Sequence, residues 1–350
     1  MKNWEKYIRR VEPYVPGEQP KNRNVIKLNT NENPYPPAPG VEKARQAFSD
    51  DCLRLYPDPA ASALTDVLAD YYGLKPEQVF VGVGSDDVLA MAFLTFFNSD
   101  QPILFPDITY SFYSVWADLF RIPYKRPALD NNFHMVKEDY YQPNGGIVFP
   151  NPNAPTSLLE PLSFIRDILD HNQDSVVIVD EAYIDFGGES AVSLLEEYDN
   201  LLVVQTFSKS RSMAGMRIGY AMGNPALIKA LSDVKYSYNS YTMNQPSLVL
   251  GVEAVKDDVY FKETLGKIIK TREEAKVKLA ELGFECLDSA SNFLFAAHKR
   301  VPAKQIFTEL KEEGIFVRYF NSARIDNYLR ITVGTPEEME KLYQSLAKYQ

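Results

Sequence analysis

The chain has 350 residues, of which 45% are hydrophobic and 24% are charged, a composition typical of folded proteins that exceed the size of one domain. Its net charge of −10 leaves no basic surface for phosphate contacts, so we expect no nucleic-acid partner. Two distant cysteines, three scattered histidines and only short apolar runs predict no disulfide framework, no metal site and no membrane span.

Residues 1–39 are rich in proline, asparagine and charge. This texture predicts an extended N-terminal arm after a short opening helix, and an arm of this kind usually packs on another part of the assembly. The charged start, Met1–Lys6, has no apolar stretch behind it. We therefore expect no signal peptide and a cytoplasmic location.

From about residue 60, short apolar runs alternate with polar loops and helical patterns, which is typical of βαβ units and a mostly parallel sheet. The predicted strands are Val79–Val83, Ile103–Phe105, Ile147–Phe149, Val176–Val179 and Leu201–Thr206. Polar and aromatic residues follow each of them, at the strand ends where open α/β sheets bind ligands. We predict a large ligand-binding domain over residues 40–254.

Near residue 255 the pattern changes to a long charged helix, Val255–Leu282, with a solvated face. A further helix is predicted near Ala303–Glu313, between short strands around Glu285–Leu287, Phe293–Ala296, Ile315–Arg318 and Tyr328–Thr332. These elements predict a smaller α+β domain over residues 255–350, joined by part of the arm. The predicted fold class is α/β, with a mostly parallel central sheet flanked by helices.

Lys209 follows the end of a predicted buried strand. A lysine is costly there unless it is used, because desolvation penalises the ammonium and favours the nucleophilic amine, which attacks aldehydes. The hydroxyls of Thr206 and Ser208 and the guanidinium of Arg217 are donors that suit a phosphate ester. The segment predicts an anchored phosphorylated aldehyde, although the lysine alone fits a polar surface loop better.

Asp180 changes that balance, because a carboxylate at the end of the apolar run Val176–Val179 needs a cationic partner. A protonated pyridine nitrogen is such a partner. We expect Tyr183, three residues further on, to reach the phenolic oxygen of that pyridine ring. The alternative is that Asp180 only caps the helix that follows.

Gly84, Ser85 and Asp86 lie between a predicted strand and the predicted helix Val88–Phe97. Helix N-termini bind phosphate through their free N–H groups, although the carboxylate of Asp86 is awkward beside an anion. Tyr110 follows another strand, where it suits stacking on an aromatic ring and ordinary packing equally well.

Together, these segments resemble fold-type I pyridoxal-phosphate (PLP) dependent aminotransferases and, among them, the histidinol-phosphate aminotransferase family. The resemblance covers nearly the whole chain. The segments that carry it are Glu12–Tyr14, Lys27–Pro34, Leu55–Pro57, Gly82–Asp87, Thr109–Tyr110, Asp180–Tyr183, Ser208–Lys209 with Arg217, Ser291–Phe293 and Leu329–Gly334.

The resemblance implies that PLP is the cofactor and that Lys209 is the lysine that binds its aldehyde and shuttles a proton. Asp180 is then expected on the pyridine nitrogen, Tyr183 on the ring oxygen and Tyr110 stacked on the ring. The residues expected around the cofactor phosphate are Gly84, Ser85, Asp86, Thr206, Ser208 and Arg217.

The resemblance also implies a homodimer in which Tyr56 reaches the cofactor phosphate of the other subunit. Arg330 is expected to bind the substrate's anionic group, with Arg318, Tyr14 and Asn31 close to it. No metal is implied, and the expected partners are a small amino donor and a 2-oxo acid.

The sequence departs from the family's Asn-Pro-Thr-Gly motif, in which the asparagine holds the ring oxygen. Ala154-Pro155-Thr156-Ser157 stands in its place. The contact to the ring oxygen is left to Asn153, to Asn151 or to Tyr183 alone.

The implied reaction is PLP-dependent transamination between L-histidinol phosphate and 2-oxoglutarate, which yields imidazole-acetol phosphate and glutamate in histidine biosynthesis. Two related activities stay open, an aromatic amino-acid aminotransferase and a PLP-dependent decarboxylase of a phosphorylated amino acid. An alternative from another class is a regulatory domain that binds the cofactor without catalysis, as in transcription factors that fuse this fold to a DNA-binding module. The acidic net charge disfavours this alternative.

Overall fold

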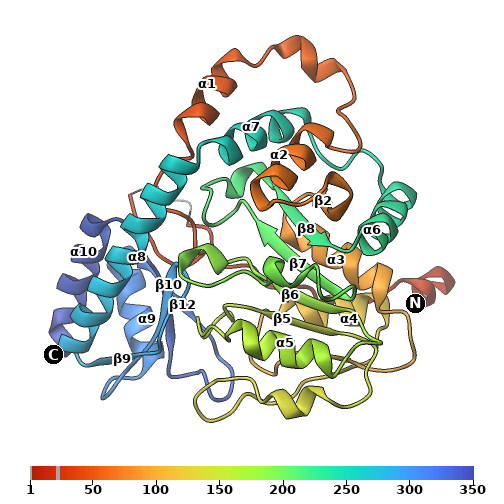
Figure 1. Ribbon diagram of the computed structural model, residues 1–350. Helices are drawn as coiled ribbons and strands as arrows, with labels where there is room; N and C mark the ends of the chain where they lie inside the picture. Colours follow the sequence, from red (N-terminus) through yellow and green to blue (C-terminus); the bar gives the residue numbers. More distant parts are fainter. Residues whose placement is uncertain (1, 21–23) are drawn as a thin grey trace.

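The computed structural model describes residues 2–20 and 24–350. Figure 1 shows a large sheet flanked by helices and, beside it, a smaller sheet covered by helices α8, α9 and α10. Among the described residues, no helix combines the length and the apolar character that crossing a membrane requires.

The large sheet has seven strands in the order β2-β8-β7-β6-β5-β3-β4. Only β8 runs antiparallel to its neighbours, so the predicted mostly parallel sheet is confirmed. The strands are β2 (Val79–Gly82), β3 (Ile103–Leu104), β4 (Tyr124–Lys125), β5 (Ile147–Pro150), β6 (Val177–Asp180), β7 (Leu201–Thr206) and β8 (Gly219–Gly223).

Strand β8 has no counterpart among the strands predicted from the sequence. Glycines bound it at both ends and it contains no β-branched residue, so its β-propensity is low. Gly219 is required by a close approach, since a Cβ atom there would lie 2.2 Å from the backbone nitrogen of Ser85. The strand thereby brings the chain that follows Lys209 against the start of helix α3.

Helices cover both faces of the large sheet. Alternate strand residues face opposite layers: Ile178 and Val204 pack with one set of helices, and Val179 and Val203 with the other. The first set is α3 (Ser85–Phe96), α4 (Phe112–Phe120) and α6 (Pro225–Tyr238). The second set is α1 (Pro39–Ala47), α2 (Ser62–Tyr72), α5 (Leu162–Asp170) and α7 (Gln245–Lys256).

The smaller sheet is antiparallel, in the order β12-β13-β10-β9. Its strands are β9 (Phe284–Cys286), β10 (Phe293–His298), β12 (Arg318–Tyr319) and β13 (Leu329–Thr332). The helices over it are α8 (Asp258–Glu281), α9 (Ala303–Glu312) and α10 (Pro336–Leu346). Leu279, Leu294, Ile306 and Leu342 are at the centre of a core of its own.

The helix predicted over Val255–Leu282 is divided in the structure. Helix α7 ends at Lys256, and the side chain of Asp257 accepts a hydrogen bond from the backbone N–H of Tyr260, which starts α8 as a new helix. The predicted strand Ile315–Arg318 is divided as well, because β11 (Ile315–Phe316) pairs with a different strand from β12.

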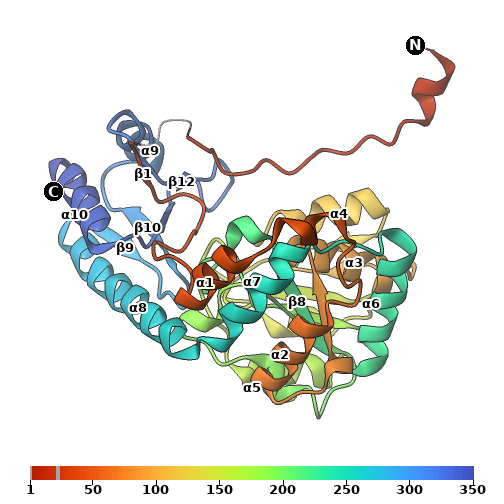
Figure 2. The ribbon, with the colours of Figure 1, turned by 90° about the horizontal axis from the view of Figure 1, so that it is seen from above.

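The arm begins with a short 3-10 helix, Asn3–Tyr7, and continues in extended form to residue 20, as predicted. Figure 2 shows its first residues reaching well away from the rest of the chain. Residues 1 and 21–23 of the predicted arm lie outside the described residues. Further on, β1 (Ile26–Lys27) pairs with β11, and the backbone N–H of Thr332 donates to the Leu28 carbonyl. The arm therefore runs along the smaller sheet.

Other short 3-10 helices punctuate the loops. They are η2 (Asp50–Arg54), η3 (Pro76–Gln78), η4 (Lys137–Tyr140), η5 (Ile184–Phe186), η6 (Ala191–Leu194), η7 (Ala214–Met216) and η8 (Ala347–Tyr349).

Candidate active site

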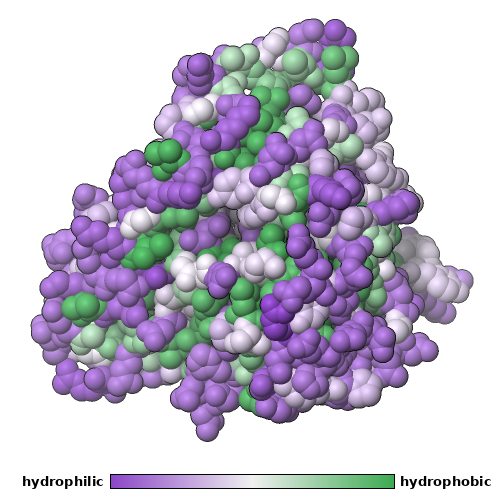
Figure 3. All heavy atoms as spheres, viewed as in Figure 1, coloured by the Kyte–Doolittle hydropathy of each residue, from purple (hydrophilic) through white to green (hydrophobic). Residues whose placement is uncertain are grey.

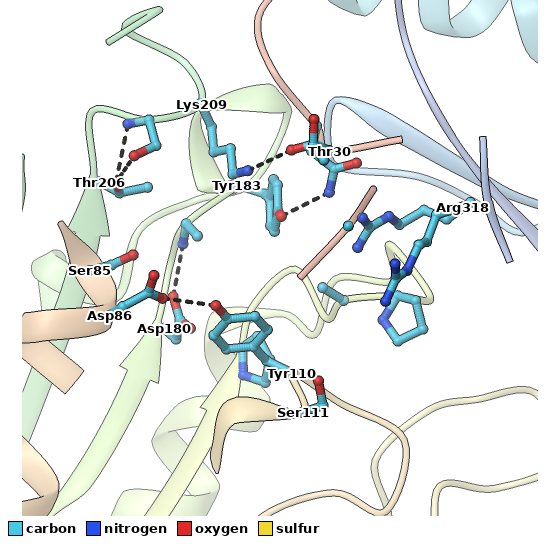
Figure 4. Close-up of a pocket in the computed structure, with 18 of the residues that line it drawn as sticks. Thr30, Ser85, Asp86, Tyr110, Ser111, Asp180, Tyr183, Thr206, Lys209 and Arg318 are labelled. Carbon is cyan, nitrogen blue, oxygen red and sulfur yellow. Dashed lines mark hydrogen bonds between the residues drawn. The ribbon is translucent and has the colours of Figure 1, made fainter. Parts of the chain in front are cut away.

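A cavity with an empty volume of about 1050 Å³, its open mouth included, lies where the large sheet, the smaller sheet and the arm meet. Figure 4 shows Asp86, Asp180 and Lys209 on one side of it and Arg318 on the other. We call the first side the large-sheet wall, which comprises Ser85, Asp86, Asp180, Thr206, Ser208, Lys209 and Arg217. The opposite small-sheet wall comprises Arg318, Phe320 and Arg330. The arm contributes Tyr14, Thr30 and Asn31.

Lys209 lies in the loop after β7, with its side chain turned toward the arm (Figure 4). Its Nζ donates to the Thr30 carbonyl at 3.1 Å and lies 5.6 Å from the centre of the Tyr183 ring. The Lys209 carbonyl in turn accepts from the Asn33 side chain at 3.1 Å. The arm thus holds this lysine through both its side chain and its backbone.

Asp180 is the last residue of β6 and is only 4% exposed. Burial raises the pKa of its carboxyl to about 6, against the opposing effect of hydrogen bonds from the Tyr113 hydroxyl at 2.9 Å and the Ala182 N–H at 3.2 Å. A carboxylate in this position favours a cationic partner in the cavity. Sequence reasoning missed Tyr113, because a tyrosine inside a helix is usually a packing residue.

Four polar side chains gather near the N-terminus of α3. Ser208 Oγ accepts from Thr206 Oγ1 at 3.0 Å and from Arg217 Nη1 at 3.3 Å, and Arg217 Nη2 lies 3.5 Å from Asp86 Oδ2. The first turn of α3, which begins at Ser85, also has N–H groups without partners inside the helix. Hydroxyls, a guanidinium and helix N–H groups together form a site that suits a phosphate.

Gly84 precedes α3 and does not line the cavity, but it shapes the wall. Its φ of +84° lies in the left-handed region, and an added Cβ would be 2.4 Å from Arg217 Nη2. A glycine is therefore needed for Arg217 to reach Ser208.

Tyr110 lines the cavity with its hydroxyl anchored. The hydroxyl donates to Asp86 Oδ1 at 2.8 Å, and the ring meets Tyr113 and Trp116 edge-on. The ring therefore has a fixed orientation, as stacking on a ligand requires.

The small-sheet wall carries two arginines that are direct partners across β12 and β13. Arg318 and Arg330 lie 5.5 Å and 5.6 Å from the centre of the Phe320 ring. Burial lowers the pKa of Arg330, and the neighbouring positive charge of Arg318 lowers it further. Among residues 2–20 and 24–350, neither arginine forms an ion pair, and Arg330 Nε has no hydrogen-bond partner. Two adjacent unpaired guanidinium groups form a site for an anion.

The two arm residues predicted near the substrate differ in their surroundings. Tyr14 stacks on Phe112 with ring centres 4.1 Å apart, and burial raises the pKa of its hydroxyl. The Asn31 side chain is already engaged at both ends, since Nδ2 donates to the Tyr183 hydroxyl at 2.9 Å and Oδ1 accepts from Thr332 Oγ1 at 3.0 Å.

The structure does not bring Asn151 or Asn153 to the cavity wall, contrary to what was predicted for one of them. Asn153 Nδ2 donates to the Ile108 carbonyl and to Thr156 Oγ1, both at 3.0 Å. Asn151 exchanges two hydrogen bonds with the Glu160 backbone. Both amides are therefore used to hold the loop, and it is the methyl group of Ala154 that lines the cavity.

Tyr56 is also outside this cavity. It follows η2, is 83% exposed and packs against Tyr241 at 4.6 Å between ring centres. Its role in another subunit's site stays a prediction.

The sequence reasoning gave no role to Thr30 or Phe320. Thr30 acts through its carbonyl, which carries no residue-specific signal, and Phe320 lies in a loop after a two-residue strand.

The family model for aminotransferase class I and II matches residues 23–346. This chain belongs to that family. It is 53% identical over 331 residues to the histidinol-phosphate aminotransferase of Brachyspira hyodysenteriae, covering 94% of each chain. It is 51% identical over 347 residues to that of Clostridium botulinum, covering 99% of this chain and 98% of the relative. The resemblance predicted from the sequence is confirmed.

The structure of a histidinol-phosphate aminotransferase from Sinorhizobium meliloti in complex with pyridoxal-5'-phosphate matches with a TM-score of 0.85 and 23% identity. The match covers 93% of this chain and 91% of that one. At this identity the likeness concerns the fold, and it confirms the predicted α/β architecture of fold-type I aminotransferases.

Proposed function

We propose that this protein transfers the amino group of L-histidinol phosphate to 2-oxoglutarate with PLP as cofactor, a reaction of histidine biosynthesis. The products are imidazole-acetol phosphate and glutamate. The observation that carries the proposal is one cavity that has Lys209 on its large-sheet wall and the unpaired guanidinium groups of Arg318 and Arg330 on its small-sheet wall. Relatives with about half of their residues identical carry the same activity in their names.

The large-sheet wall fits PLP. Asp180 offers a buried negative charge for the pyridine nitrogen, and its pKa of about 6 leaves it ionised at neutral pH. Lys209 lies in the same wall for the aldehyde. The residues we assign to the phosphate are Ser85, Asp86, Thr206, Ser208 and Arg217, with Gly84 making room for Arg217.

When bound, PLP supplies the electron sink for the transfer. The protein's own part is to hold, orient and move protons. We propose that Lys209 Nζ takes the proton that leaves the amino-bearing carbon of the substrate. The Thr30 carbonyl, which accepts a hydrogen bond from Lys209 Nζ, holds the lysine side chain in the cavity. Tyr110, fixed by Asp86, is assigned to the face of the ring, and Tyr183 to the ring oxygen.

The small-sheet wall suits both substrates of such a reaction. A phosphate monoester and the distal carboxylate of 2-oxoglutarate are anions that paired guanidinium groups bind in turn. Tyr14 adds a donor, because the raised pKa of its hydroxyl keeps the proton in place. Asn31, predicted in the same group, reaches the cavity beside them.

We further propose a homodimer with composite sites. Tyr56, Leu53, Leu55, Tyr238 and Tyr241 are exposed large hydrophobic residues near α1, α2 and α7. Figure 3 shows apolar side chains on the upper part of the molecule, where these helices lie, and further apolar patches nearer the centre of the same face. A second copy covering this surface would let Tyr56 reach the partner's phosphate site.

The proposed domains are residues 1–39, 40–254 and 255–350, the last with part of the arm. The smaller sheet has a hydrophobic cluster of its own, which supports a division between the two larger domains.

A comparison of steady-state rates tests the function. The purified protein, reconstituted with PLP, is expected to turn over L-histidinol phosphate with 2-oxoglutarate at a far higher kcat/KM than L-phenylalanine. Lys209→Ala is expected to abolish both activities and the absorption band of lysine-bound PLP. Preference for phenylalanine would replace the assignment with an aromatic aminotransferase. Release of carbon dioxide without an oxo acceptor would replace it with a decarboxylase.

A further inference from the structure

Ala154 leaves the cavity short of one hydrogen-bond donor. Its methyl group lines the cavity and shares a hydrophobic cluster with Tyr183. The amides of Asn151 and Asn153 do not replace the missing donor, because they already bond to the Glu160 backbone, the Ile108 carbonyl and the Thr156 hydroxyl. The Tyr183 hydroxyl is then the group that we assign to the ring oxygen.

The environment of Asn31 fixes which end of its amide faces Tyr183. The backbone N–H of Asn31 donates to Thr332 Oγ1 at 3.0 Å, so the Thr332 hydroxyl must send its own proton elsewhere. That proton goes to Asn31 Oδ1, also at 3.0 Å. The Nδ2 end is thereby turned toward the Tyr183 oxygen, 2.9 Å away.

The backbone of Asn31 is also held in place. Its carbonyl accepts from Asn292 Nδ2 at 3.0 Å, and its φ of +56° lies in the left-handed region, which asparagine tolerates better than most residues. The residue is only 1% exposed. Asn31 is therefore held through its backbone and its side chain, and its Nδ2 donates to the Tyr183 hydroxyl.

We propose that Asn31 is a positioning residue that holds the Tyr183 hydroxyl as a donor to the cofactor's ring oxygen, in place of the asparagine that Ala154 has replaced. The inference rests on the proposed function, since it requires PLP on the large-sheet wall. Because the Tyr183 oxygen accepts from Asn31, its own proton is free to point into the cavity. Accepting that bond also makes the hydroxyl a stronger donor.

The titration of lysine-bound PLP reports this contact directly. A donor to the ring oxygen competes with the Schiff-base proton for that oxygen, so a stronger donor lowers the pH at which the absorption band titrates. Asn31→Gly keeps the left-handed backbone and removes the amide. We expect it to raise the titration midpoint by roughly half a unit to one unit. Thr332→Val should act in the same direction, and Thr332→Ser, which keeps the hydroxyl, should not.

The decisive experiment is a cycle of four proteins reconstituted with PLP: wild type, Asn31→Gly, Ala154→Asn and the double variant. Ala154→Asn restores a direct donor and should lower the midpoint. In its presence the shift caused by Asn31→Gly should shrink to less than half. If Asn31 had only a structural role, Asn31→Gly would lower the thermal stability. The titration midpoint would then stay unchanged, or it would shift equally with alanine and with asparagine at position 154.

Two results would overturn the inference: an Asn31→Gly midpoint equal to that of wild type, or the same shift in both backgrounds. If wild-type protein showed no lysine-dependent band at all, the proposed function would fail and the inference with it. These failures are distinguishable, because the first two occur in protein that binds PLP normally.

Discussion

The large-sheet wall and the small-sheet wall of the cavity differ in how their charges are paired. On the large-sheet wall, Asp86 contacts Tyr110 and Arg217, and Asp180 accepts from Tyr113. On the small-sheet wall, Arg318 and Arg330 stand side by side without a carboxylate among the described residues. The first wall has its geometry fixed by the protein's own contacts, whereas the second carries a charge that only an incoming anion balances. We therefore expect mutations on the first wall to affect the chemistry and those on the second to affect selectivity.

The largest effect is expected from Asp180→Asn, which removes the buried negative charge that we assign to the ring nitrogen. The loss of one member of a buried charge pair should lower kcat by roughly 10²–10⁴-fold. Steady-state rates at saturating PLP measure this. Activity within a few-fold of wild type would show that the carboxylate has no partner in the cofactor.

Arg330→Gln should act on selectivity. Loss of a charged, bidentate hydrogen-bond donor should reduce kcat/KM for L-histidinol phosphate by roughly 10²–10³-fold, while the absorption band of bound PLP stays unchanged. Lys311→Gln is the matched control, since it removes a positive charge that pairs with Glu18 on the surface. A change in the PLP band of Arg330→Gln would contradict the division between the two walls.

Tyr113→Phe should shift a pH limit. Burial raises the pKa of Asp180 to about 6 and the Tyr113 bond opposes that rise, so removal of the bond moves the pKa further up. In the proposed site the carboxyl holds the ring nitrogen only when it is ionised, so we expect cofactor affinity to fall as the pH drops through this pKa. In the variant the fall should begin at a higher pH. We expect a displacement of roughly half a unit to one unit.

The pH dependence of PLP binding measures the displacement. Tyr140→Phe is the control, because that buried hydroxyl has no hydrogen-bond partner within the described part of the chain. Equal profiles for the two variants would mean that Tyr113 does not act on Asp180.

The smallest effect is expected from Tyr14→Phe, since the ring would still stack on Phe112 and only one hydroxyl donor is lost. KM for L-histidinol phosphate should rise by roughly 2–10-fold with kcat unchanged. A comparable rise in KM for an amino-donor substrate without a phosphate, such as phenylalanine, would argue against a contact between Tyr14 and the phosphate.

The two walls also differ in how well the sequence predicts them. The large-sheet wall comes from residues at strand ends, and local patterns identified Lys209, Asp180 and Arg217 together with their neighbours. The small-sheet wall combines a second sheet with an arm that is far away in the chain. The hydrogen bond from Arg330 to the Asn29 carbonyl, for example, joins residues 301 positions apart, and such a contact leaves no local pattern in the sequence. Arg318 and Arg330 were therefore predicted through family resemblance only.

The position of Asn153 away from the cavity wall has a different origin. Which of several adjacent side chains faces a cavity depends on bonds to distant backbone, here the Ile108 carbonyl, and not on residue type. Tyr113 was missed for a related reason, because its role depends on reaching the end of another element. Strand β8 was missed because its glycines serve a close approach and lower its β-propensity.

The most direct test of the account is a half-reaction followed by absorption. Protein reconstituted with PLP is mixed with L-histidinol phosphate in the absence of any oxo acid, and 2-oxoglutarate is added afterwards. We predict that the lysine-dependent band disappears with the first addition and returns with the second, whereas histidinol without its phosphate requires a far higher concentration. A band that L-histidinol phosphate leaves unchanged, or that histidinol removes equally well, would contradict the assignment of Lys209 and the two arginines to one active site.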